Sequence, residues 1–107
     1  MANISWNFSN RKVLIVGDSR GIGGCLHANF VKAGAEVYGI NSGNCDISNT
    51  DDIDSFFSHR FNPDEIDILV NVAGINYTNK IEWVSINEWD KVLDTNLRSF
   101  FYITQQV

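Results

Sequence analysis

Three short apolar runs divide the chain and predict its strands. They occupy residues 13–16, 35–41 and 66–72, and stretches with helical spacing separate them. In the first run and in the centre of the third, apolar residues do not alternate with polar ones. Such unbroken apolar runs are typical of strands that are buried on both faces. Strands of this kind, alternating with amphipathic helices, favour an α/β fold with a parallel sheet.

The first predicted helix covers residues 20–32. Leu26 and Phe30 lie four residues apart and so share one face of this helix. Gly34 follows, and glycine is the residue that most readily ends a helix. His27 lies within the helix without an acidic or cysteine partner nearby in the sequence, so we interpret it as a structural residue.

Two further helices are predicted downstream. Ser48 can cap a helix of about 12 residues that begins at residue 49 and ends before Pro63. Ser85 and Glu88 have the spacing of a capping box, so a long helix begins just after Ser85. Apolar residues continue along it at steps of three and four. The stripe that we expect to be buried consists of Trp89, Val92, Leu93, Asn96, Leu97, Phe100, Ile103, Thr104 and Val107.

Glycines at positions 17, 21 and 23 lead from the first strand into the first helix. Gly17 allows a sharp turn, Gly21 allows the backbone to approach a pyrophosphate, and Gly23 allows the helix to pack close to the sheet. The N-terminus of such a helix presents unpaired N–H groups to an anion. The spacing G-x-x-x-G-x-G departs from G-x-G-x-x-G, and it lacks the Lys-Ser or Lys-Thr of a phosphate loop, so an ATPase or GTPase is disfavoured.

Composition narrows the possible functions. A length of 107 residues indicates one domain. The formal net charge is −5 and the eight basic residues are scattered, which disfavours nucleic-acid binding. Cys25 and Cys45 lack C-x-x-C or histidine-paired spacing, so we expect thiols in a cytoplasmic protein and no metal site. No apolar segment reaches the roughly 18 residues of a membrane span.

The glycine spacing combines with two later clusters. Residues 69–74 read L-V-N-V-A-G, and Asn96-Leu97 lies in the last predicted helix. In this order the clusters resemble the short-chain dehydrogenase/reductase family over residues 11–107. The resemblance implies a Rossmann-like three-layer α/β/α fold with a parallel sheet in the order 3-2-1-4. It also implies that residues 1–107 form a single, incomplete dinucleotide-binding domain, the cofactor-binding portion of such an enzyme.

The resemblance also implies a nicotinamide dinucleotide as cofactor. Asn41 stands where a carboxylate would accept the ribose hydroxyls of NAD, and Arg20 is either a cation for the 2′-phosphate of NADP or a solvated residue at the helix start. We therefore expect NADP to be preferred over NAD. Asp46 matches the family's adenine-binding acid or marks a helix entry, and the helix that usually precedes this position is missing. The expected cofactor-binding residues are Gly17, Ser19, Arg20, Gly21, Ile22, Asn41, Asp46, Asn71, Ala73 and Gly74.

For the catalytic site the resemblance assigns Asn96, because the family's asparagine holds a water linked to the catalytic lysine. The alternative is a purely structural amide. Family chemistry moves a hydride between nicotinamide and a carbonyl or alcohol carbon, using a serine and a Tyr-x-x-x-Lys pair. Tyr102 is the only tyrosine after Asn96, and Gln106 stands at the lysine position. We expect the chain alone to be inactive, which leaves open whether it is an enzyme.

Two other functions are compatible with the same sequence features. One is a non-catalytic dinucleotide-binding or sensing module, and the other is a protein-interaction scaffold with a decayed site. The strand at residues 66–72 lacks a following strand, and an unpaired apolar edge recruits other chains. We therefore expect self-association or a complementing chain, and neither nucleic acid nor a membrane as a partner.

Overall fold

A computed structural model describes residues 3–59 and 62–107. At its centre lies a parallel sheet of three strands in the order β2-β1-β3. All three strands therefore direct their carboxyl ends to the same edge of the sheet. The strands are β1 (Lys12–Val16), β2 (Glu36–Ile40) and β3 (Ile68–Asn71).

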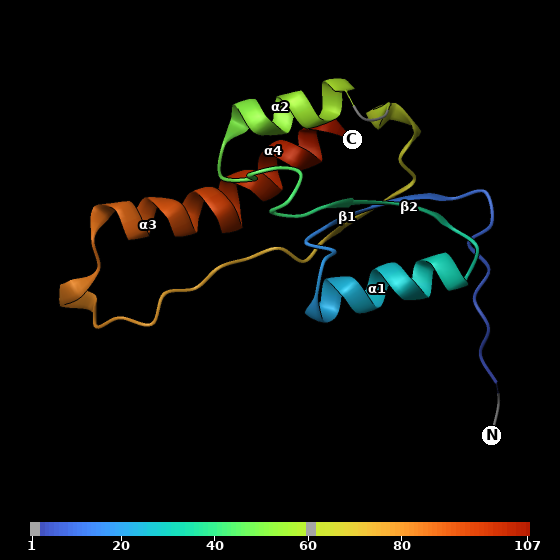
Figure 1. Ribbon diagram of the computed structural model, residues 1–107, viewed down its shortest axis with the longest axis horizontal. Coiled ribbons are helices and arrows are strands. Elements are labelled where there is room, and N and C mark those ends of the chain that lie inside the picture. Colours follow the sequence, from blue (N-terminus) through green and yellow to red (C-terminus); the bar gives the residue numbers. More distant parts are fainter. Residues whose placement is uncertain (1–2, 60–61) are drawn as a thin grey trace.

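Helices cover both faces of this sheet (Figure 1). α1 packs against β1 and β2 on one face, whereas α2 and α4 lie side by side on the other. α3 extends away from the sheet and joins α4 through the π-helical turn η3. This arrangement confirms the predicted Rossmann-like, three-layer α/β/α fold. The helices are α1 (Gly21–Lys32), α2 (Thr50–His59), η1 (Pro63–Glu65), η2 (Ile81–Trp83), α3 (Ile86–Leu93), η3 (Asp94–Arg98) and α4 (Ser99–Gln106).

β1 is the most deeply buried strand, as its unbroken apolar run predicts. Its last four residues are fully inaccessible to solvent. Leu14 and Val16 join the core that α2 and α4 cover, with Ile53 and Ile103 contributed by those helices. β3 is only half-buried, so the expectation of burial on both faces is wrong for this strand. It is half-buried because it lies at the edge of the sheet in the described chain.

The order β2-β1-β3 reproduces the 2-1-4 part of the predicted order. Among the described residues no strand occupies the remaining position outside β2. Residues 41–49 instead form tight turns, and the Asn41 carbonyl accepts bonds from the N–H groups of Asn44 and Cys45 at 3.1 and 3.0 Å. This connection is too short to hold a helix and a strand, so the chain passes from β2 directly toward α2.

The helix caps agree with the sequence at one helix and differ at another. Ser85 Oγ accepts the N–H of Glu88 at 3.1 Å and the Glu88 carboxylate accepts the N–H of Ser85, which confirms the capping box of α3. At α2 the predicted cap Ser48 is wrong. Asn49 Oδ1 accepts the N–H groups of the first turn, because Ser48 is bonded into the preceding loop.

The π-helical turn η3 changes which face of the last helix is buried. The buried residues are Thr95, Ser99 and Ile103, at steps of four. Asn96 and Leu97, predicted to be buried, are exposed, because a π turn holds one residue more than an α turn and shifts the register. Of the nine residues expected in the buried stripe only Ile103 is buried, and Trp89 and Leu93, which precede the π turn, are exposed as well. The large apolar side chains of this stretch point away from the core. We call these exposed residues the outer face: Trp89, Leu93, Leu97, Phe100 and Phe101.

Candidate functional site

A cavity of 670 Å³ opens at the carboxyl edge of the sheet. Val16, Ile40 and Val72, at the ends of the three strands, contribute to its wall. Ligands of open α/β sheets bind at this edge. Of the predicted cofactor residues, the cavity is lined by Gly17, Ser19, Arg20, Ile22, Asn41, Asp46, Ala73 and Gly74, whereas Gly21 and Asn71 are not part of its lining.

Gly17 brings the first turn against the turn after β3. Its φ of +93° is unfavourable for residues with a Cβ, and a Cβ here would lie 2.8 Å from the Ala73 nitrogen. The Gly17 N–H donates to the Ile40 carbonyl at 2.7 Å, and the Val16 carbonyl accepts the N–H of Ala73 at 2.9 Å. The ends of all three strands are thus hydrogen-bonded into one rigid floor.

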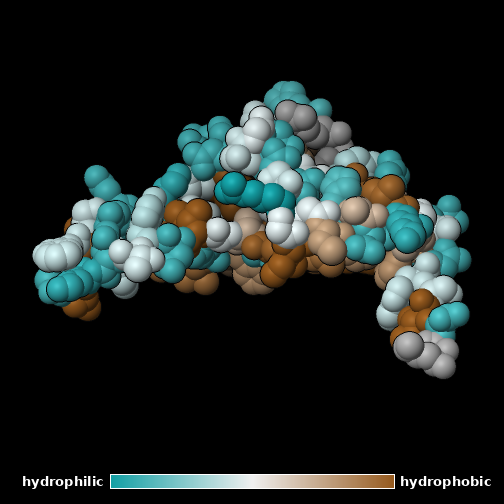
Figure 2. All heavy atoms as spheres, turned by 60° about the horizontal axis from the view of Figure 1, so that its bottom comes forward, coloured by the Kyte–Doolittle hydropathy of each residue, from teal (hydrophilic) through white to brown (hydrophobic). Residues whose placement is uncertain are grey.

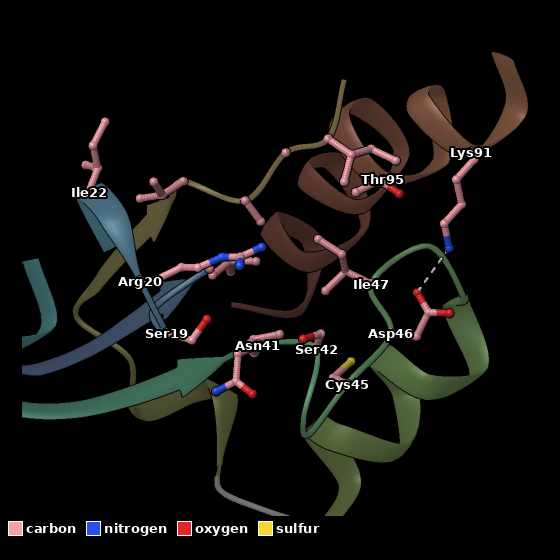
Figure 3. Close-up of a pocket in the computed structure, with 17 residues that line it drawn as sticks. Ser19, Arg20, Ile22, Asn41, Ser42, Cys45, Asp46, Ile47, Lys91 and Thr95 are labelled. Carbon is pink, nitrogen blue, oxygen red and sulfur yellow. Dashed lines mark ion pairs between the residues drawn. The ribbon is translucent and has the colours of Figure 1, made fainter. Parts of the chain in front are cut away.

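The N-terminus of α1 opens onto this floor. No side chain caps it, and its first turn carries no acidic residue. Its first N–H groups therefore have no partner within the helix. Arg20, the residue before the helix, is exposed and extends its guanidinium across the cavity (Figure 3). Backbone donors and a cation placed together in this way can bind a phosphate.

Gly23 holds α1 close to the sheet, as its position in the sequence predicts. A Cβ at Gly23 would lie 1.6 Å from the carbonyl oxygen of Gly17. Gly21 has a φ of +60°, and a Cβ there would meet nothing within 4 Å. Gly21 therefore serves backbone conformation, and its approach to a pyrophosphate stays a prediction.

Asp18 lies beside the site, although the sequence pattern did not predict a role for it. Its side chain is nine-tenths buried, and its Oδ2 lies 2.8 Å from Nδ1 of His27. His27, interpreted as a structural residue, thus has an acidic partner that lies nine positions before it in the sequence. Gly39 is the signal that could have revealed the pair, since its missing side chain leaves the space that the Asp18 carboxylate fills.

Asn41, at the end of β2, is tied to Asp18. Its Nδ2 donates to Asp18 Oδ1 at 3.1 Å, and its own Oδ1 accepts the N–H of Gly43 at 2.9 Å. These two bonds fix the orientation of the side-chain amide, and Asn41 and the neighbouring Ser42 line the cavity.

A cluster of charged and polar residues links the elements that form the far wall of the cavity. Lys91 donates to Ser48 Oγ at 2.8 Å and pairs with Asp46 Oδ1 at 3.8 Å (Figure 3). Hydrogen bonds from Ser48, together with the Lys91 ammonium, hold the pKa of Asp46 below its ordinary value. Arg98 donates to the Ser48 carbonyl. The short connection after β2 is thereby attached to α3 and η3, and Lys91 was not expected at this wall.

Two buried polar atoms of the described chain lack a hydrogen-bond partner, Asn71 Oδ1 and Thr95 Oγ1. Thr95 lines the cavity, and Asn71 ends β3 beside it. Buried polar groups are normally hydrogen-bonded. The site therefore fits a polar ligand that brings hydroxyl, amide or phosphate groups.

Asn96 and Tyr102 do not line the cavity. Asn96 Oδ1 accepts the N–H of Ile75 at 2.8 Å, and Asn96 Nδ2 donates to the Ile75 carbonyl at 2.7 Å. Tyr102 donates to Asp54 Oδ1 at 2.6 Å, and this bond raises the pKa of the phenol. Asn96 thus anchors the segment after β3 to η3, whereas Tyr102 joins α4 to α2.

Within residues 3–59 and 62–107 no group of histidine, cysteine and acidic side chains could hold a metal ion. In the same part of the chain, every helix is too short or too polar to cross a membrane.

Comparison with known proteins decides the family. A family model described as enoyl-(acyl carrier protein) reductase matches residues 26–107. The chain belongs to the short-chain dehydrogenase/reductase family. The 3-oxoacyl-[acyl-carrier-protein] reductase FabG of Salmonella typhimurium is 30% identical over 94% of the chain and 49% of the relative. The D-xylose 1-dehydrogenase of Caulobacter vibrioides is 28% identical over 94% and 48%, respectively.

Solved structures of short-chain dehydrogenase/reductase proteins share the fold. The aldohexose dehydrogenase of Thermoplasma acidophilum superposes with a TM-score of 0.74 and 32% identity, over 91% of this chain and 42% of that one. A short-chain dehydrogenase/reductase variant from Serratia marcescens, 24% identical, superposes with a TM-score of 0.72 over 92% of this chain and 50% of that one, which supports the fold. The chain spans about half the length of the curated relatives that it matches.

Proposed function

We propose that the cavity binds a nicotinamide dinucleotide and that residues 1–107 form a single, incomplete cofactor-binding domain of a family oxidoreductase. One observation carries the proposal: the uncapped N-terminus of α1, the Arg20 guanidinium and the ends of three parallel strands open onto one cavity. The reductases and dehydrogenases among the relatives support the reaction class. A cytoplasmic location stays a prediction.

The cavity offers a place for each part of the dinucleotide. In this proposal the first turn of α1 holds the pyrophosphate, because unpaired N–H groups favour an anion. The unsatisfied Oγ1 of Thr95, which lines the cavity, forms a hydrogen bond with the ligand. When bound, the dinucleotide supplies or takes up a hydride, while this chain binds and orients it. The ribose then lies against Asn41 and Ser42, the base against Asp46 and Ile47, and the nicotinamide half along Ala73 and Gly74.

The 2′-phosphate of NADP is read by Arg20 in this proposal. Replacing Arg20 with alanine removes a charge-assisted contact, so we expect the dissociation constant of NADP to rise about tenfold or more. The dissociation constant of NAD should change less than twofold. Isothermal titration calorimetry of both dinucleotides measures the difference.

Arg11→Ala is the matched control, because Arg11 is an exposed arginine at the amino edge of the sheet, away from the cavity. It should leave both affinities unchanged. Equal losses of NAD and NADP affinity in Arg20→Ala would show that Arg20 does not read the 2′-phosphate. If neither dinucleotide binds the wild-type chain, the proposed function itself is wrong.

We assign Asn96 a positioning role in this function. Both ends of its amide bond Ile75, and Ile75 lines the cavity next to Gly74. Asn96 therefore holds the wall along which the nicotinamide half would lie. This assignment favours the structural alternative for Asn96 over direct contact with a catalytic water.

We also propose that the chain self-associates. The outer face is largely exposed, Leu97 to 62% and Phe101 to 58%, and β3 has no strand on its outer side in the described chain. Apolar residues also reach the surface among polar ones in Figure 2. Apolar surface and an unpaired strand edge both recruit other chains.

At tens of micromolar, a range in which exposed edges commonly associate, we expect sedimentation velocity to show dimers or larger species. Leu97→Lys should shift the distribution toward monomer, because it places a charge within the outer face. Ile4→Lys is the control, since Ile4 is 77% exposed but lies in the N-terminal arm. A wild-type chain that stays monomeric would contradict the proposal.

A further inference from the structure

We propose that Asp18 is a specificity-determining residue for the adenosine ribose: its carboxylate opposes a 2′-phosphate and limits the NADP preference that Arg20 provides. This inference rests on the proposed function, because it concerns the same cavity. It adds a residue for which the sequence offered no role.

The position of Asp18 is defined on three sides. Nδ1 of His27 in α1 lies 2.8 Å from Oδ2, and Nδ2 of Asn41 lies 3.1 Å from Oδ1. On the third side is Gly39 of β2, where a Cβ would lie 1.8 Å from Oδ2. The carboxylate is therefore held beneath the end of β2, with little freedom to move.

The end of β2 is where dinucleotide folds distinguish the two ribose forms. A carboxylate there accepts the hydroxyls of NAD, whereas a 2′-phosphate requires the acid to be absent and a cation to be near. The strand itself ends in Asn41, which has no charge. Asp18 is not part of the cavity lining, but its carboxylate lies behind the Asn41 side chain and so adds a negative charge next to this place.

Asp18 also makes one N–H donor of the Asn41 side chain unavailable to a ligand. The Asn41 amide has two N–H donors, of which one is bonded to Asp18, while its Oδ1 accepts the N–H of Gly43. Nearby, Lys91 is occupied by Ser48 and Asp46 at the far wall. Arg20 is thus the cation left to face a 2′-phosphate among the described lining residues, and Asp18 reduces its effect.

Asp18→Asn tests this inference, because it keeps the shape of the side chain and an oxygen for Asn41 while removing the charge. Calorimetric titrations with NADP and NAD, and with adenosine 2′,5′-bisphosphate and 5′-AMP, give the affinity ratio that the 2′-phosphate produces. We expect this ratio to rise about five- to tenfold in Asp18→Asn, mainly through tighter binding of the 2′-phosphorylated ligands.

Asp67→Asn is the matched control. Asp67 Oδ2 accepts the N–H of Lys12 at the amino edge of the sheet, so this variant changes the net charge equally without touching the cavity. Its ratio should equal that of the wild type. A ratio that is unchanged or lower in Asp18→Asn, or raised equally in Asp67→Asn, would overturn the inference.

Asp18→Ala provides a second measurement if the asparagine variant folds poorly, and circular dichroism monitors folding in both. It removes the charge and also releases the Asn41 amide, so its ratio must rise as well; a ratio that does not rise overturns the inference. Wild-type chain that binds neither dinucleotide would instead overturn the proposed function. The two failures are therefore distinguishable.

Discussion

Gly23→Ala is expected to destabilise the protein by about 3 kcal/mol or more, at the upper end of the cost of overpacking. The new methyl group would lie 1.6 Å from the Gly17 carbonyl oxygen and 2.7 Å from its carbonyl carbon. Both atoms belong to backbone that is hydrogen-bonded to β2, so they cannot move aside cheaply. Urea unfolding followed by circular dichroism measures the change in the free energy of unfolding.

Gly24→Ala makes the same chemical change one residue later in α1. A Cβ at Gly24 would find its nearest neighbours at 3.5 Å, which is ordinary contact. Because alanine is the better helix former, we expect a gain of roughly 0.5–1 kcal/mol. Similar losses in the two variants would show that helix propensity, and not the close approach of α1 to the glycine turn, governs this site.

The second large effect concerns catalysis. We expect the 107-residue chain alone to show no turnover, because a missing acid/base group costs roughly 10²–10⁴ in rate. Tyr102, the one tyrosine after Asn96, is bonded to Asp54 and does not line the cavity. The absorbance of reduced nicotinamide, followed with a panel of ketones, aldehydes and alcohols, provides the assay.

Tyr102→Phe is the companion variant for this assay. It removes the hydroxyl while leaving the ring between α4 and α2. Wild-type turnover above background that disappears in Tyr102→Phe would mean that Tyr102 supplies the proton after all. Turnover that survives the substitution would point to a different acid/base group, and it would also contradict the expected inactivity.

Features that depend on near neighbours in sequence were predictable. The apolar run of β1, the capping box at Ser85 and the close packing at Gly23 each follow from a few adjacent residues, and the structure contains all three. The cavity lining follows from the same logic, because parallel strands place their ends at one edge. The glycine turn, Asn41 and Ala73 meet there although they are far apart in the sequence.

Features that depend on distant or competing contacts were not predictable. Asp18 meets Asn41 across 23 positions, and Lys91 meets Ser48 across 43. The π turn was hidden for another reason: the apolar spacing after Trp89 is regular, so it predicts an unbroken helix with its apolar stripe inward. In the structure the core accepts Thr95 and Ser99 instead. Hydrophobic pattern alone cannot reveal which face finds a partner.

The central position of β1 sets an order for folding. β1 reaches β2 across the single helix α1, whereas its bonds toward β3 join residues as far apart as Lys12 and Asp67, 55 positions along the chain. The larger loop costs more entropy to close, about 0.6 kcal/mol for each doubling of length. The unit of β1, α1 and β2 should therefore assemble first, also during synthesis from the N-terminus. Until β3 pairs with it, β1 has one open edge, and an open apolar strand edge favours association with other chains.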